Sequence, residues 1–297
     1  MNKKHMLIDG HSILVRAFYG VPMLTTSNGV HTNAVYGFLN MMFKFLEEEN
    51  PDYLTVAFDM PVPTFRHETY SDYKGTRGSM EIELKEQIPI IQSVLNAMNI
   101  AVVMQPGLEA DDLLGTIARS SEDAGMNVTI ISGDRDLLQL ATEKTQIRIP
   151  KTKKGGNEVE NYYAADVKAR YMVTPIEFID VKALMGDTSD NIPGVPGIGE
   201  KTATKLIAEY STIESVYNKA VCGELKPPKA CKAMLEHYNL AKLSKELATI
   251  KTDADMTKFL FEKGTYSLDK AKIENMFNDE AKKWFNALEL HKWDNKF

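Results

Sequence analysis

The chain has 297 residues, of which 43% are hydrophobic and 26% charged, values typical of a folded globular protein with one large or two modest domains. No apolar stretch is long enough to cross a membrane, and an apolar strand pattern begins too close to the N-terminus for a signal peptide. We therefore expect a cytoplasmic protein with no membrane partner. Cys222 and Cys231 lack the CxxC spacing of a zinc site, and reduced structural thiols are their simplest interpretation.

The net charge of −6 does not exclude a nucleic-acid partner. Nine of the acids gather in a few short clusters, and without them the remainder has a slight excess of lysine and arginine. How the charge is distributed matters more for DNA binding than its sum.

The predicted elements alternate between strand and helix over the first half of the chain. Short β-branched and aromatic runs bounded by turn formers indicate strands of a parallel sheet buried on both faces. Such runs occur at 5–9, 53–59, 100–104 and 128–132. Helices are predicted at 34–50, at 81–99 with a break or kink at Pro89, and after residue 109; a polar, aromatic stretch occupies 61–80. A short strand at 147–150, a hairpin-like turn at 153–157 and a mainly helical remainder from about Ala164 complete the pattern.

The nine clustered acids lie where carboxylates contribute little to folding. They are Asp9, Asp59, Glu109, Asp111, Asp112, Asp134, Asp136, Asp187 and Asp190. Three of them end or closely follow predicted strands, and ligands of parallel sheets bind at that edge. Two carboxylates about 4 Å apart repel by roughly 4 kcal/mol at an effective dielectric of about 20, so divalent cations are the expected counter-ions. Oxygen-only ligands favour Mg²⁺ or Mn²⁺ over Zn²⁺, and this many acids favour two metals, an arrangement used for phosphoryl transfer.

Each acid taken singly has an ordinary structural interpretation. Glu109, Asp111 and Asp112 could simply favour the start of a helix, and Asp134 and Asp136 could cap the next one. The recurrence of acids at strand ends, and the two acids spaced three apart in both GLEADDLLGTIA and MGDTSDN, favour a shared site instead.

A second motif, GVPGIGEKTATKLIAEY, occupies residues 194–210. Gly197 and Gly199 allow a tight turn, while Lys201 and Thr202 open an amphipathic helix whose first amides can bind an anion. The motif is typical of a helix-turn-helix that binds DNA phosphates without reading bases. A tight connection between two helices is the alternative, although the proximity of Asp190 favours the first interpretation.

The motifs together resemble the 5′-nuclease domain of bacterial DNA polymerase I, within the flap endonuclease superfamily. The resemblance rests on LIDGHSILVRAFYG, AVYGFLNM, FDMPVPTFRHETYSDYKGTR, PGLEADDLLGTIA, ISGDRDLLQL, LMGDTSDNIPGVPGIGEKTATKLI and LKPPKACKAMLEHYNLAKLSKELATIKTD, in that order and nearly to the end of the chain. It implies an α/β fold: a PIN-like parallel-sheet nuclease core with a helical arch, then a helical subdomain containing a helix-three-turn-helix. We expect the core at 1–172 with the arch at about 61–98, and the DNA-binding subdomain at 173–297 with the helix-three-turn-helix at about 184–210.

The resemblance also implies an activity and its partners. The expected activity is metal-dependent, structure-specific 5′ nuclease cleavage of 5′ flaps and of nicked or gapped duplex DNA, in primer removal, replication and repair. The implied cofactor is Mg²⁺, in two or more ions and replaceable by Mn²⁺, with room for a K⁺ ion at the helix-three-turn-helix. The expected partner is DNA, including RNA primer–DNA hybrids, and the expected state is a monomer.

The same resemblance assigns roles to residues. It implies a first metal cluster of Asp9, Asp59, Glu109, Asp111 and Asp112, and a second of Asp134, Asp136, Asp187 and Asp190. Lys74 and Arg77 would act on the scissile phosphate and Tyr73 would stack on a base, with a solvated basic loop and a packed tyrosine as the alternative. Arg16, Arg66, Phe18 and Tyr19 are weaker candidates for DNA contact, and the two aromatics could equally be core residues.

Some questions stay open at this point. The sequence GSMEIEL follows Arg77 where relatives usually carry prolines and an acid, which leaves the geometry of the arch undecided. A PIN-type ribonuclease and a DNA-binding protein without catalysis are the rival functions. The sequence does not decide between an excised domain and a free-standing nuclease.

Overall fold

The computed structural model describes residues 2–153, 156–260 and 266–296, and its centre is a six-stranded sheet. The strand order is β3-β2-β1-β4-β5-β6, and all neighbours are parallel except the antiparallel pair β5 and β6. The strands are β1 Lys4–Asp9, β2 Tyr53–Ala57, β3 Ala101–Val103, β4 Asn127–Ile131, β5 Thr145–Lys153 and β6 Gly156–Tyr162. The predicted turn between β5 and β6 falls partly on residues 154–155, outside the described residues. Because β1 lies between β2 and β4, the carboxyl ends of these three strands meet at one edge.

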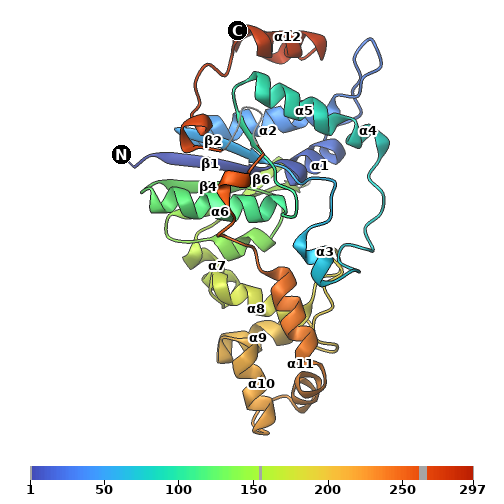
Figure 1. Cartoon of the computed structure of the whole chain (residues 1–297), viewed down its shortest axis with the longest axis vertical. Helices are drawn as coiled ribbons and strands as arrows, with labels where there is room; N and C mark the ends of the chain where they lie inside the picture. The colour runs from blue at the N-terminus through green and yellow to red at the C-terminus, as the bar shows by residue number, and fades with distance from the viewer. Residues whose placement is uncertain (1, 154–155, 261–265, 297) are drawn as a thin grey trace.

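Helices cover both faces of the sheet, which explains why the strands are apolar on both sides. Met6 and Ile8 of β1 pack with α1 Gly10–Gly20, α2 Asn33–Glu49 and α5 Gln87–Ala97. On the opposite face Leu7 packs with α6 Ala110–Asp123 (Figure 1). The predicted parallel α/β core is therefore confirmed.

The predicted arch is shorter than the range 61–98. Only two short helices, α3 Phe65–Thr69 and α4 Ile82–Lys85, lie within residues 61–86, which we call the arch segment. The next helix, α5, buries Ile91, Val94 and Leu95 in the core, so it is not part of an arch. The break predicted near Pro89 falls between α4 and α5, with the proline in the first turn of α5.

A helical unit extends from the α6 side of the sheet (Figure 1). It contains α7 Ala164–Tyr171, α8 Pro175–Met185, α9 Glu200–Tyr210, α10 Ile213–Val221 and α11 Pro228–Ala248. Thr174 caps α8 through a hydrogen bond from the Glu177 amide, and Pro175 occupies its first turn. The 3-10 helix η1 Asp136–Leu140 packs against α8 and joins this unit to the end of β4. Apolar residues of α8 to α11 continue the core on the α6 face without a break.

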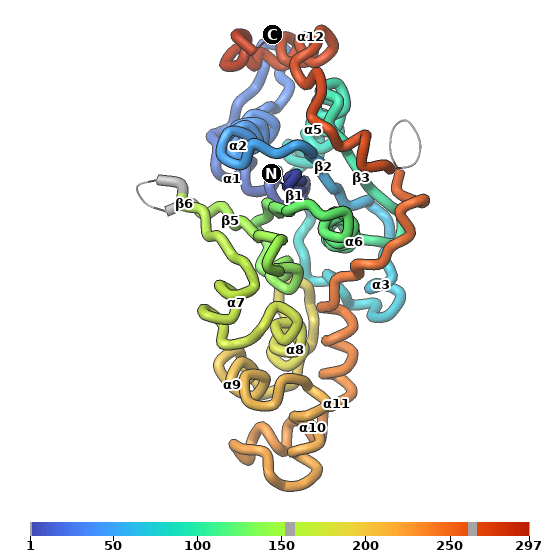
Figure 2. Tube along the Cα trace, turned by 90° about the vertical axis from the view of Figure 1, so that its left-hand side faces the viewer, coloured from blue at the N-terminus to red at the C-terminus, as the bar shows by residue number. Residues whose placement is uncertain are grey.

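The C-terminal part of the chain does not belong to the helical unit, contrary to the predicted range 173–297. After α11 it returns along the sheet to the α5 side (Figure 2). It forms η2 Met256–Lys258, η3 Leu268–Ala271, α12 Asp279–Ala287 and η4 His291–Lys296. Ala281, Phe285 and Trp293 are buried in the same cluster as residues of α2 and α5. These apolar side chains complete the core, which is the physical reason for the correction.

The described segments contain no helix that is both long enough and apolar enough to cross a bilayer.

Candidate metal and DNA site

The last residue of β1 begins the site. Asp9 caps α1: its Oδ1 accepts a hydrogen bond from the Ser12 amide at 3.0 Å, and its Oδ2 accepts one from Ser132 Oγ at 2.6 Å. Burial raises the pKa of Asp9 to about 7, with further increases from the charges of Asp59 and Asp134 and opposition from the two hydrogen bonds. Because burial dominates over the hydrogen bonds, a nearby cation is needed to keep the Asp9 carboxylate fully ionised at neutral pH.

Asp59 lies two residues beyond β2 and faces the start of α6. Its Oδ1 accepts a hydrogen bond from the Ala110 amide at 2.8 Å, and its own amide donates to His11 Nδ1 at 3.2 Å. The ends of β1 and β2 can approach because Gly10 has no side chain: a Cβ there would lie 2.6 Å from the Phe58 ring. His11 was not singled out from the sequence; its place directly after Asp-Gly at a strand end is the available signal.

Asp111 and Asp134 complete a set of acids without lysine or arginine partners, in which Asp59 lies 3.7 Å from His11 Nδ1. Burial raises the pKa of Asp111 well above its usual range, and the charges of Asp9 and Asp134 add to the effect. Asp134 Oδ1 accepts the Asp136 amide at 2.9 Å. Among the described residues, no lysine or arginine forms an ion pair with these acids, which we call the open group. The open group is Asp9, Asp59, Asp111 and Asp134.

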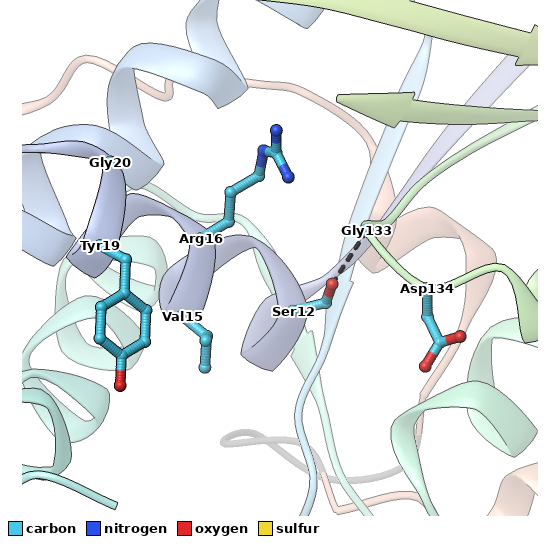
Figure 3. A pocket seen from close by; sticks show the side chains of 7 residues that line it. All are labelled: Ser12, Val15, Arg16, Tyr19, Gly20, Gly133 and Asp134. Atoms are coloured by element: carbon cyan, nitrogen blue, oxygen red, sulfur yellow. Dashed lines mark hydrogen bonds between the residues drawn. The ribbon is translucent and has the colours of Figure 1, made fainter. Parts of the chain in front are cut away.

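One member of the open group, Asp134, lines a hollow of about 550 Å³. Its lining comes from the exposed face of α1 and from the loop after β4, as Figure 3 shows. Ser12 and Gly133 face each other through a hydrogen bond of 2.9 Å, with Asp134 next to them. Arg16, which we expected to contact DNA, is half-buried and lines the same hollow. The position is compatible with that expectation and does not test it.

Lys74 and Arg77 of the arch segment lie against two other acids. Lys74 Nζ is 2.7 Å from Glu109 Oε1 and 3.9 Å from Asp190 Oδ2, and Arg77 Nη2 is 2.5 Å from Asp190 Oδ1. Lys74 takes a positive φ of 56°, uncommon for a residue other than glycine, and its amide donates to the Asp190 carbonyl at 2.8 Å. The structure thus brings the predicted phosphate-binding pair to the acids and ties the arch segment to the loop after α8.

A third basic residue, Lys182, lies between Asp136 and Asp187. Its Nζ is 2.7 Å from Asp136 Oδ1 and also pairs with Asp187, and its side chain is buried. Burial and the neighbouring Asp134 charge raise the pKa of Asp136 to about 7 despite this ion pair. Although burial acts in the opposite direction, Lys182 and Ser189 lower the pKa of Asp187 to about 2.

Lys182 was missed from the sequence. Its only signal is a lysine inside the apolar run VKALM, five residues before Asp187. We call the acids with lysine or arginine partners at this edge the paired group: Glu109, Asp136, Asp187 and Asp190.

The loop that carries Asp187 and Asp190 is closed by two glycines. Gly186 and Gly194 have φ values of 73° and 62°, and a Cβ on Gly186 would lie 2.6 Å from the Ile192 carbonyl oxygen. The motif MGDTSDNIPG therefore encodes a pinched loop that holds both acids in place.

Two residues with predicted roles, Arg66 and Asp112, form one buried ion pair. Arg66 is 2% exposed and Asp112 is fully buried. Arg66 Nη1 and Nη2 donate to the two Asp112 oxygens at 2.8 and 2.9 Å. The Glu109 and Lys251 amides donate to the same two oxygens, and Arg66 also donates to the carbonyls of Leu247 and Thr249. Asp112 therefore has no free face for a metal, and Arg66 has none for DNA. Together they join the arch segment, α6 and the end of α11.

Tyr73, predicted to stack on a base, is buried in this structure. Its ring is 3% exposed and packs edge-on against His67, so no face is available to a base. Its hydroxyl lies 3.1 Å from Glu109 Oε2 and 3.0 Å from Asp190 Oδ2. Of the two aromatic residues among the weaker candidates, Phe18 is a core residue, whereas Tyr19 is 66% exposed and donates to Glu81 of the arch segment at 2.6 Å.

The start of α9 has the open geometry predicted for a phosphate contact. Gly197 has a φ of 87°, and Gly199 precedes the first residue of the helix. A Cβ on either glycine would meet nothing within 4 Å, so the turn is accessible. Lys201 is exposed, while the Thr202 amide already donates to the Gly199 carbonyl at 2.9 Å.

Across the described ranges no three acid, histidine or cysteine side chains converge closely enough to hold a metal ion. The donor chemistry nevertheless fits Mg²⁺, because the side chains at this edge are carboxylates. The paired group faces lysine and arginine instead of a common centre. Metal binding would therefore require these ion pairs to open.

Two family models match consecutive parts of the chain. The first, "5'-3' exonuclease, N-terminal resolvase-like domain", matches residues 4–172. The second, "5'-3' exonuclease, C-terminal SAM fold", matches residues 173–271. Together they cover most of the chain.

Curated relatives are similar over nearly the same region. DNA polymerase I of Bacillus subtilis is 48% identical over 252 residues, which are 85% of this chain and 28% of the relative. DNA polymerase I of Bacillus caldotenax is 44% identical over 279 residues, 94% of this chain and 31% of the relative. The chain thus spans about a third of the length of these relatives.

Solved structures share the fold at low identity. The 5′-exonuclease of bacteriophage T5, solved with bound zinc ions, superposes with a TM-score of 0.68 at 22% identity, covering 97% of this chain and 99% of the other. The catalytic core of Rad2 in complex with a DNA substrate gives a TM-score of 0.58 at 19% identity, covering 97% and 88%.

Proposed function

Because the chain belongs to the 5′-3′ exonuclease family, we propose that it is a metal-dependent nuclease that hydrolyses phosphodiesters at 5′ flaps and in nicked or gapped duplex DNA. The observation that carries this proposal is the gathering of the open and paired groups at one sheet edge, with Lys74 and Arg77 in direct contact with Glu109 and Asp190. RNA primer–DNA hybrids are included among the substrates, and the working state is a monomer.

The acids other than Asp112 are the proposed metal ligands. Asp9, Asp59, Glu109 and Asp111 would hold the first Mg²⁺ ion, and Asp134, Asp136, Asp187 and Asp190 the second; Mn²⁺ would substitute. Bound Mg²⁺ supplies a water of lowered pKa and stabilises charge on the leaving oxygen. The raised pKa values of Asp9 and Asp136 support this assignment, since these carboxylates lack enough positive charge around them.

Lys74 and Arg77 are the proposed catalytic cations. In the metal-free protein they neutralise Glu109 and Asp190, and a metal would take over that role. The released ammonium and guanidinium groups would then lie beside the phosphate and stabilise the charge that builds up on it.

The helical unit is proposed to hold the duplex. Gly197, Gly199, Lys201 and Thr202 form an accessible helix start that suits a phosphate of any sequence. A K⁺ ion at the same turn is part of the proposal. The affinity of this contact should fall with salt, because DNA binding releases counter-ions.

A labelled 5′ flap tests the proposal directly. We expect cleavage in Mg²⁺ or Mn²⁺, none in chelator, and binding without cleavage in Ca²⁺, whose larger and looser coordination positions the reacting groups poorly. An RNA hairpin should be cut much more slowly than the flap. Cleavage in chelator would refute the metal mechanism, and preference for the hairpin would favour a ribonuclease.

Single-turnover rates of Lys74→Ala separate chemistry from binding. The variant should lose more in the rate of the bound complex than in flap affinity, because the contact strengthens as charge develops. Lys85→Ala, which removes an exposed lysine from the same arch segment, is the matched control and should cut normally. A loss confined to affinity would make Lys74 only a phosphate contact.

A further inference from the structure

A second hollow lies behind α1, away from the acids. Its volume is about 320 Å³, within the range of small-molecule sites. It is enclosed by α1, α2, the β5–β6 hairpin and η4, and it contains none of the nine acids. Four elements distant in sequence therefore form its wall.

The floor of this hollow is apolar. Ala17, Val21 and Phe45 line it on the helix side, and Val159 lines it on the hairpin side. The two helices cross closely at Gly37, where a Cβ would lie 2.8 Å from the Ala17 side chain. Such a floor suits a flat organic group.

The rim of the hollow is basic. Arg16, Lys44, Lys151 and Lys292 line it, against the single acid Glu158. Lys151 is held in an ion pair with Glu160 at 2.6 Å. Lys44, by contrast, is 3.7 Å from Glu48 at an exposed pair, and Lys292 donates to the neutral Asn40 side chain. These last two contacts contribute little, so an anion could replace them at small cost. Lys44 and Lys292 therefore provide positive charge at the rim that favours an anionic ligand.

The second hollow adjoins the first. Arg16 and Gly20 line both, and the first also contains Ser12 and Asp134 at the acid edge (Figure 3). Gly20 has no side chain, and a Cβ there would meet nothing within 4 Å, so the space beside this shared residue is open. A small product released at the acids would have a short path to this site.

We propose that the second hollow binds a nucleoside 5′-monophosphate, the mononucleotide product of stepwise cleavage. Its base would lie on the apolar floor and its phosphate at the rim lysines. The choice of a nucleotide as the anion rests on the proposed function. The enclosed volume suits one nucleotide and not a continuing strand.

The test is equilibrium binding to the intact protein in chelator, so that no cleavage enters the result. The probes are dAMP, deoxyadenosine and inorganic phosphate. We expect dAMP to bind at least about tenfold more tightly than either of the others, since each lacks one half of the recognised group. Equal binding of phosphate or of deoxyadenosine would overturn the nucleotide assignment.

Charge reversals locate the site. Lys44→Glu and Lys292→Glu, on two separate elements, should each weaken dAMP binding at least about tenfold. Lys232→Glu is the matched control: Lys232 forms the same i,i+4 pair with a glutamate, also at 3.7 Å, on α11. All three side chains are exposed, so folding should be retained and is checked by thermal melting. Unchanged affinity in both rim variants would place any dAMP binding elsewhere and refute the proposal.

Flap cleavage separates this inference from the proposed function. Lys44→Glu should cut a flap at the wild-type rate although its dAMP binding is weakened. If the wild-type protein bound dAMP with the expected variant pattern but cut no flap, the binding site would stand and the proposed nuclease would fail. If it cut flaps and both rim variants bound dAMP as tightly as the wild type, the proposed function would stand and this binding site would fail.

Discussion

The open and paired groups of acids lie at the same edge of one sheet, yet their charges are balanced in different ways. The open group depends on backbone amides, serines and His11, and burial raises the pKa of its member Asp9 to about 7. The paired group faces lysine and arginine, and Lys182 together with Ser189 lowers the pKa of Asp187 to about 2 against the effect of burial. The basic side chains thus occupy the position that cations would take in the paired group. The open group has no such substitute.

This difference implies that metal binding has two parts. The open group gains from a cation directly, whereas the paired group must first exchange a lysine or arginine for it. The exchange would link metal binding to the release of Lys74 and Arg77 towards the phosphate.

The largest expected effect distinguishes two adjacent residues. Asp112→Asn should lower the free energy of unfolding by about 3 kcal/mol, because it removes the carboxylate that accepts from both terminal nitrogens of the buried Arg66 and leaves only Glu109, 3.4 Å away, as its charge partner. Asp111→Asn should leave the metal-free protein as stable or more stable, because it removes a repelled carboxylate. Urea unfolding in chelator measures both. Equal destabilisation by the two variants would contradict the separation of Asp112 from the metal ligands.

The pH dependence of stability should have opposite signs in the two groups. The pKa of Asp9 is raised in the folded protein, so folding takes up a proton, and stability falls as pH rises from about 4 towards 7. The pKa of Asp187 is lowered, so its contribution is present above about 4 and is lost as pH falls towards 2.

Differences between each variant and the wild type isolate these terms from all other titrating groups. In chelator, the stability of Asp9→Asn relative to wild type should increase by a few kcal/mol between about pH 4 and pH 7, since one pKa unit corresponds to about 1.4 kcal/mol. The deficit of Asp187→Asn should shrink below about pH 4. The same sign in both variants would remove the electrostatic distinction between the groups.

Loss of two paired acids should mainly affect catalysis. Asp187→Asn with Asp190→Asn should slow single-turnover flap cleavage at least about 100-fold, a barrier increase near 3 kcal/mol. Flap binding in Ca²⁺ should persist. The metal-free protein should lose some stability, because Lys182 and Arg77 each lose an ion pair. Cleavage near the wild-type rate by the folded variant would show that this pair holds no essential metal.

His11 offers a smaller and more selective test within the open group. Its Nδ1 accepts the Asp59 amide, so we regard it as a positioning residue for that carboxylate. Asparagine can place its Oδ1 near the Nδ1 position, and glutamine reaches the Nε2 position. His11→Asn should therefore retain most activity and Mg²⁺ affinity, while His11→Gln should lose about tenfold, close to the cost of one unpaired amide. A more active glutamine variant would indicate that His11 acts through Nε2.

The smallest expected effect lies outside both groups. Lys201→Ala should weaken duplex binding equally for all sequences and reduce the salt slope by about 1. Flap cleavage at saturating enzyme should not change. Titrations at several salt concentrations measure the slope, and Lys232→Ala serves as an exposed-lysine control. An unchanged slope would mean that Lys201 faces away from DNA.

The sequence predicted the sheet and its acid edge because the signals there are local. Asp9 and Asp59 follow apolar runs, and parallel strands must bring such ends together. The pairing of Arg66 with Asp112 joins residues 46 positions apart, and no spacing rule predicts such a contact. The buried Lys182 escaped attention because a lysine in a helix is usually solvated. The return of α12 to the core was missed because it, too, is a long-range contact. The apolar residues of α12 indicate burial but do not identify the surface on which they pack.

That return has a consequence for the order in which the protein can be completed during synthesis. A ribosome releases α2 and α5 long before residues 276–293, which contribute Met276, Phe285 and Trp293 to the same cluster. Until those residues emerge, the apolar side chains of α2 and α5 that they cover remain exposed, and the nascent chain presents this apolar surface to other molecules. A C-terminal truncation at residue 271, where the second family model stops matching, would make that transient condition permanent.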